Sequence, residues 1–168
     1  MKPNTIKRLP ALAFASLLAL LLAVSGLSQA EDYKSDAKRL EGTWIVQVTQ
    51  HDCASGAALG SPFLSLLTFA RGGTMTETTS NPMIAPPVFR GPGHGVWSYK
   101  GGDTYRASTI ALITVNGVLA KTQVITQRIE MGDNPDEFTT PKASVHFYDP
   151  TGKLLMTGCA TAVGKRFE

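Results

Sequence analysis

The sequence predicts an all-β protein folded as an eight-stranded antiparallel up-and-down β-barrel. Eight strand-like segments carry alternating or β-branched residues, and no segment has the 3.6-residue apolar period of a long helix. The connections are short enough for consecutive strands to pair in antiparallel fashion. The first and last segments also favour one mutual register, which closes the sheet into a barrel.

Residues 1–30 have the pattern of a secretory signal peptide. A basic start precedes an apolar run at residues 11–24, and small residues follow up to Ala30. We therefore expect the mature chain to begin at Glu31 and residues 31–168 to form a single domain, exported to the periplasm or the cell exterior. The apolar run is shorter than the roughly 20 residues of a membrane-spanning helix, so we expect no membrane anchor in the mature chain.

The net charge of the mature chain excludes one class of partner. Three of the 16 Lys and Arg residues lie in the signal, whereas none of the 13 Asp and Glu residues do. The mature domain is therefore close to neutral, and the basic character of the whole chain belongs to its signal. Nucleic-acid binding needs a basic patch on the folded domain, so we expect no nucleic-acid partner.

The strands follow from alternation and from turn signals. Residues 31–41 are expected to form an arm or a short helix. Residues 81–94 hold four prolines and are expected to be a loop, because proline cannot donate to a sheet ladder. Asn116-Gly117 predicts a type I′ hairpin turn. The predicted strands begin at residue 44 and continue at 63–70, 74–80, 95–100, 104–115, 118–131, 138–148 and 154–163.

Two residue pairs predict how the barrel closes. Cys53 and Cys159 both lie in the exported part of the chain, where a disulfide is the default state of two cysteines; a two-cysteine metal site is the alternative. Pairing Trp44 with Arg166 places a cation over an aromatic ring. The two pairings require registers that differ by only two residues, which favours direct pairing of the first and last strands.

Gly42-Thr43-Trp44 at the first strand and Arg166 after the last resemble the calycin superfamily of lipocalins, fatty-acid-binding proteins and avidins. The resemblance implies a barrel that binds small apolar or amphipathic molecules. It also implies that Trp44 plugs the closed end and that Arg166 covers it. The chain departs from typical lipocalins because no long helix follows the last strand, so the branch of the superfamily stays open.

The long connections at residues 51–62 and 81–94 leave the same end of the predicted barrel, which we call the mouth. A ligand is expected to enter there, and no cofactor is expected. Gln123 and Gln127 share one strand face, so an inward orientation predicts a partly polar cavity and an outward one a solvated face. Inward aromatic residues are either ligand walls or plain core. The candidate ligand-binding residues are Phe69, Trp97, Tyr99, Gln123 and His94.

Signatures of catalysis are missing from the sequence. It contains no G-x-S-x-G, H-E-x-x-H or P-loop motif, so no catalytic residue is assigned and binding is favoured over catalysis. Glu77 is expected to face solvent. If it faced inward, it would be the best acid or base for the alternative of a barrel isomerase or cyclase. A further alternative is an envelope protein-binding inhibitor with a filled interior and an exposed apolar patch at residues 82–89.

The histidines carry no ligand spacing diagnostic of a metal, and we expect no metal site. His51 and His94 are interpreted as loop or surface residues, with a metal or haem site at the mouth as the alternative. His146 is expected to lie on the sheet with a hydrogen-bond partner. The domain is expected to be a monomer whose partner is a small hydrophobic or amphipathic ligand.

Overall fold

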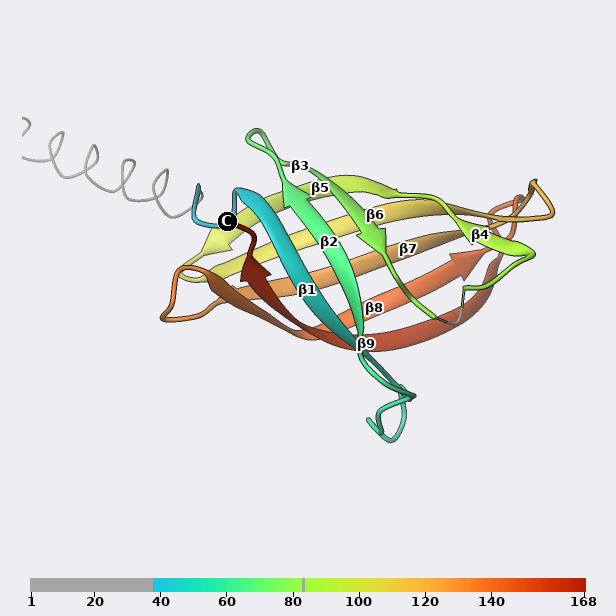
Figure 1. The fold of residues 1–168 in the computed structure, drawn as a ribbon, viewed down its shortest axis with the longest axis horizontal. Coiled ribbons are helices and arrows are strands. Elements are labelled where there is room, and N and C mark those ends of the chain that lie inside the picture. Colours follow the sequence, from blue (N-terminus) through green and yellow to red (C-terminus); the bar gives the residue numbers. More distant parts are fainter. Residues whose placement is uncertain (1–37, 83) are drawn as a thin grey trace, which may run out of the picture. The chain divides into compact units, whose positions relative to one another are not determined.

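A computed structural model describes residues 38–82 and 84–168 of the chain, which form a closed antiparallel β-barrel (Figure 1). The predicted signal peptide and the first residues of the predicted arm lie outside the described residues. The strands are β1 (Gly42–His51), β2 (Phe63–Phe69), β3 (Thr74–Thr79), β4 (Val88–Arg90), β5 (Gly93–Gly101), β6 (Thr104–Val115), β7 (Val118–Met131), β8 (Glu137–Tyr148) and β9 (Leu154–Arg166).

Eight of these strands close the barrel in the order β1-β2-β3-β5-β6-β7-β8-β9, with β9 returning to β1. The predicted fold class is therefore confirmed. Trp44 pairs with Arg166 in the closing ladder, as the sequence predicted. The predicted type I′ turn is also confirmed, because Asn116 and Gly117 both have positive φ, at 51° and 79°.

The predicted loop at residues 81–94 is wrong in its second half. Val88–Arg90 forms the short strand β4, and β5 already begins at Gly93. Both strands pair with the same edge of β6, and the Gly91 amide between them donates to the Leu112 carbonyl at 2.9 Å. Pro92 has no N–H to donate, so it interrupts the hydrogen-bond ladder along β6. The chain nevertheless continues in the same direction from β4 into β5.

The barrel is packed tightly at one end, which we call the closed end. Its core holds large side chains that are fully buried, among them Trp44, Phe69, Tyr105 and Phe138. The Trp44 and Phe138 rings lie 4.9 Å apart between centroids, and Phe69 meets Phe138 edge to face. Gly164 leaves room for Phe138, because a Cβ at position 164 would lie 2.3 Å from that ring.

The opposite end is the mouth, where the β1–β2, β3–β4, β6–β7 and β8–β9 connections emerge. In Figure 1 the β6–β7 and β8–β9 turns lie at the right, whereas the C-terminus lies at the left. Register shows which side chains face inward here. Thr109, Ala111 and Ile113 of β6 are buried, and their partners on β7 are Ile125, Gln123 and Lys121.

Candidate functional site

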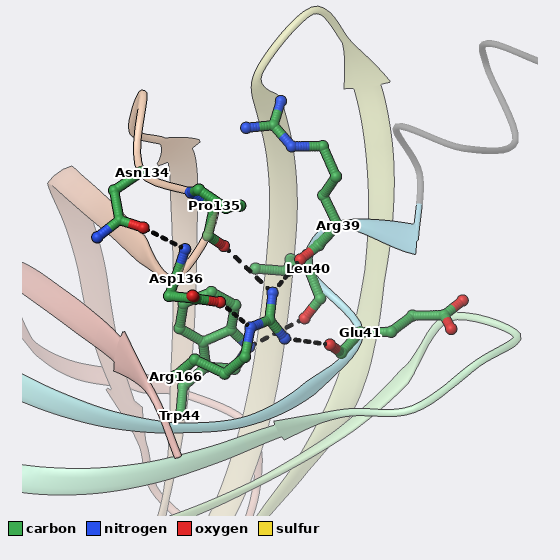
Figure 2. Close-up of polar contacts among 8 residues, drawn as sticks. All are labelled: Arg39, Leu40, Glu41, Trp44, Asn134, Pro135, Asp136 and Arg166. Carbon is green, nitrogen blue, oxygen red and sulfur yellow. Dashed lines mark hydrogen bonds and ion pairs between the residues drawn. The ribbon is translucent and has the colours of Figure 1, made fainter. Parts of the chain in front are cut away.

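The closed end is sealed by Arg166, whose guanidinium carbon lies 4.3 Å from the Trp44 ring centroid. Figure 2 shows this guanidinium surrounded by acceptors from two segments of the chain, the one before β1 and the β7–β8 turn. Its Nε donates to the Asp136 carboxylate at 2.7 Å, and its Nη1 donates to the Glu41 carbonyl at 2.8 Å. Its Nη2 donates to the carbonyls of Arg39 at 2.7 Å and Pro135 at 3.2 Å. Such a saturated cation has little capacity left to bind a ligand.

The segment before β1 completes this seal. The Trp44 indole N–H donates to the Leu40 carbonyl at 3.0 Å, and Leu40 itself is fully buried. Arg39 forms an ion pair with Asp103 in the β5–β6 turn and donates to the Gly132 carbonyl. The closed end is thus a structural plug, and any site for a small molecule lies elsewhere.

The mouth is braced by the disulfide between Cys53 and Cys159, which confirms the predicted pairing. Cys159 pairs with His51 rather than with Cys53, so the bond reaches two residues beyond the β1 ladder. His51 also ties this corner together, since its ring nitrogens hydrogen-bond to the Gly56 carbonyl and to Thr161 Oγ1. In the same loop, hydrogen bonds from Ser55 and from the Ala54 amide lower the pKa of Asp52.

The inward-facing side chains of β7 and β8 are only partly buried in the mouth half of the barrel, whereas those of β6 are buried there. Ile125 of β7 pairs with Val145 of β8, and Gln123 pairs with Phe147; the register of β7 with the buried residues of β6 puts them on the inner face. Lys121 extends over this wall, with its Nζ 5.5 Å from the Phe147 centroid. Water therefore reaches a surface that is mostly apolar but carries a few polar groups, which is the composition of small-molecule sites.

A buried ion pair lies on the opposite wall of the same half. Arg90 of β4 donates from Nη2 to Glu77 Oε2 at 2.6 Å, and the two side chains are only 3% and 9% exposed. Arg90 Nε also donates to Gln123 Oε1 at 2.5 Å, and Nη1 donates to the Gly91 carbonyl at 3.3 Å. This network links β3, β4 and β7 across the interior.

Backbone geometry makes room for the ion pair. Gly93 of β5 pairs with Glu77, and a Cβ at position 93 would lie 2.6 Å from Glu77 Oε2. Any larger residue would therefore displace the carboxylate from Arg90. The expectation that Glu77 faces solvent is wrong, because alternation along β3 puts Met75 and Glu77 on the buried side.

An open pocket of about 520 Å³ adjoins this network, between the end of β3 and β4. Arg90 and Thr79 line it together with the apolar residues of the loop above. Thr79 Oγ1 is buried, and within the described ranges it has no hydrogen-bond partner. A buried hydroxyl in that state costs free energy, so it marks a place where a ligand group could be accommodated.

The candidate ligand-binding residues are not brought together. Phe69 and Trp97 are buried in the aromatic cluster of the closed end, and Tyr99 packs on Tyr105 beside them. These three are core residues rather than walls of the mouth. His94 is exposed on the outer face of β5, since it alternates with Gly93 and Gly95. Of the five candidate ligand-binding residues, Gln123 lies on the inner face of the mouth half, where it accepts a hydrogen bond from Arg90.

The site includes two residues that the sequence did not single out, Arg90 of the polar network and Thr79 of the adjoining pocket. Arg90 lies in a stretch that was expected to be a proline-rich loop. The Val-Phe-Arg run between Pro87 and Gly91 was the available signal, because a β-branched and an aromatic residue side by side favour a strand. Thr79 has no distinguishing pattern among the threonines of β3.

The histidines lie apart from one another in the fold. His51 braces the loop at the disulfide, His94 is on the outer face, and the His146 ring lies 6.3 Å from that of Tyr148. Within residues 38–82 and 84–168, no three His, Cys, Asp or Glu side chains are grouped to hold a metal ion.

The same part of the chain contains no helix long and apolar enough to cross a membrane.

Comparison with known proteins gives no family. No family model and no curated protein matches the chain. Among solved structures, EF1p2_mFAP2b bound to DFHBI is 22% identical with a TM-score of 0.47, over 77% of this chain and 95% of that one. Rv2717c from M. tuberculosis is 15% identical with a TM-score of 0.39, over 77% of this chain and 94% of that one. Both likenesses are too weak to bear on function, which is inferred below from the chain's own residues.

Proposed function

We propose that this protein is an exported, monomeric barrel that binds a small hydrophobic or amphipathic molecule in the mouth half of its interior, without transforming it. One observation carries the proposal: the inward-facing side chains of β7 and β8 at the mouth are partly exposed, whereas those of the same strands at the closed end are buried. Apolar walls with a few fixed polar groups suit an amphipathic ligand.

A calycin relationship is part of this proposal. It is supported by the closed antiparallel barrel and by the contact between Arg166 and Trp44 at the end away from the mouth. Export is supported by the signal-like pattern of residues 1–30 and by the Cys53–Cys159 bond, which suits an oxidising compartment such as the periplasm or the cell exterior.

The experiment is a titration of the mature protein with Nile red, a neutral fluorogenic probe of apolar sites. We expect saturable binding to the wild type. Ile125→Trp fills the interior and should weaken binding by about tenfold or more, which corresponds to at least ~1.4 kcal/mol. Val124→Trp is the matched control, because Val124 faces outward beside the exposed Ile110.

Two results would count against the proposal. The first is the absence of saturable binding by the wild type. The second is an equal effect of both tryptophan variants, which would place the probe on the outer surface. Native mass spectrometry of protein purified from its own host would then test for a retained ligand, and size-exclusion chromatography with light scattering would test for a monomer.

The competing functions each match one feature only. A barrel isomerase or cyclase needs an inward acid or base, and Glu77 is inward, but its Oε2 is held by Arg90. A protein-binding inhibitor needs an exposed apolar patch near residues 82–89, and Phe89 is 65% exposed, but the partly hydrated mouth does not fit its filled interior. A binding function is consistent with the packed core at the closed end and with the partly exposed inner face of β7 and β8 at the mouth.

A further inference from the structure

The wall of the barrel changes its pairing next to the buried ion pair. The ladder between β3 and β5 ends at Glu77 and Gly93, and beyond that point β4 pairs with β6. The last residues of β3 therefore face β4 across a gap, where the pocket of about 520 Å³ is found. Residues 80–82 and 84–87 belong to the loop next to it.

The pocket is lined by polar and by apolar residues, and Ser80 and Asn81 are among the polar ones. The Arg90 side chain is almost fully buried, and three of its donor nitrogens are engaged by Glu77, Gln123 and Gly91. A guanidinium carries five N–H groups, so two of them have no partner in the described part of the chain. The buried Thr79 hydroxyl is likewise unpartnered. The apolar lining includes Pro82, Ile84, Pro86, Pro87 and Val88.

Charge decides which ligand group suits these donors. Glu77 already balances Arg90 at 2.6 Å, so the buried pair is neutral as a unit. A carboxylate entering the pocket would add an uncompensated negative charge near Glu77, and burying such a charge is costly. A neutral acceptor, such as a carbonyl oxygen, would satisfy the free donors without that cost.

We propose that this pocket binds the neutral carbonyl group of an amphipathic ligand, with Thr79 and Arg90 as donors and Glu77 as the residue that rejects carboxylates. The inference rests on the proposed function and names the ligand class for it.

The first test compares octanamide with octanoate, which differ in charge at nearly constant size, by isothermal titration calorimetry. The wild type should prefer octanamide by about tenfold or more. Glu77→Gln keeps an acceptor for Arg90 but removes the negative charge, so octanoate should bind at least about tenfold more tightly to this variant than to the wild type. Octanoate should also raise the melting temperature of Glu77→Gln.

The second test removes the free hydroxyl and does not depend on the ion pair. Thr79→Val should weaken octanamide binding by about fivefold to tenfold and leave the protein at least as stable, because an unsatisfied buried hydroxyl is lost. Thr78→Val is the matched control, since Thr78 is exposed on the outer face of the same strand. It should leave octanamide affinity unchanged.

The outcomes separate this inference from the function on which it rests. If Nile red binds but octanamide and octanoate bind equally, and Glu77→Gln changes neither, the carbonyl assignment is wrong and the binding function stands. If Glu77→Gln fails to fold, equal octanamide affinity in Thr79→Val and Thr78→Val overturns the assignment by itself. If no probe binds the wild type, the proposed function fails first.

Discussion

At the scale of single residues, Arg166 and Trp44 are expected to control stability without affecting ligand binding. Arg166→Ala removes a cation over an indole and several hydrogen bonds to backbone carbonyls, and should lower the free energy of unfolding by about 2–4 kcal/mol. Trp44→Ala should cost roughly 3–5 kcal/mol, because a large core side chain is lost. Urea unfolding measures both changes, and probe affinity should stay unchanged in Arg166→Ala.

Lys165→Ala is the control for Arg166→Ala. Lys165 pairs with Glu137 at 3.3 Å, but its side chain is largely exposed, and surface ion pairs contribute only about 0–1 kcal/mol. An Arg166→Ala variant as stable as Lys165→Ala would remove the basis for the plug.

Two inward-facing glycines of β9 give a second prediction at this scale. A Cβ at Gly164 would lie 2.3 Å from Phe138, whereas one at Gly158 would lie 3.6 Å from Val145, an ordinary contact. Gly164→Ala should therefore destabilise the fold by about 1–3 kcal/mol, and Gly158→Ala should be close to neutral. Thermal melts of the two variants check this, and equal melting temperatures would contradict the packing described for the closed end.

At the scale of elements, the disulfide joins the loop after β1 to β9. It links residues 106 apart in sequence, so its removal frees a long loop in the unfolded chain and should lower stability by roughly 2–5 kcal/mol. The double variant Cys53→Ser, Cys159→Ser tests this by chemical denaturation. Thiol titration of the denatured, unreduced protein should find no free thiol, and two reactive thiols per chain would refute the bond.

At the scale of the whole molecule, ring closure should make unfolding cooperative. Each of the eight strands that close the barrel pairs with two neighbours, so the ring has no edge strand. No strand can therefore separate from the ring without opening the core. Tryptophan fluorescence reports on the closed end, where Trp44 and Trp97 lie, and amide signals of residues 119–125 of β7 report on the mouth half. Denaturation followed by the two signals should give one midpoint, and separate midpoints would show two independent halves.

The sequence by itself determined the architecture of this protein. Alternation along β1 and the Asn116-Gly117 turn are local signals, and both are confirmed because backbone pairing follows the side-chain period. The two closing pairs join distant residues, and they predicted the register of β1 with β9 to within two residues. The disulfide was also predictable, since two cysteines that follow a signal-like N-terminal pattern favour a disulfide.

Only the tertiary structure decided where the polar site lies. Alternation assigns a residue to a face but not to a depth, so it did not distinguish Phe69 and Trp97 in the closed end from Gln123 at the mouth. The inward orientation of Glu77 depends on Arg90, which reaches it only because β4 resumes pairing with β6 after a proline-rich loop. A buried charge is stable where its partner is present, and that partner is set by the pairing of strands distant in sequence.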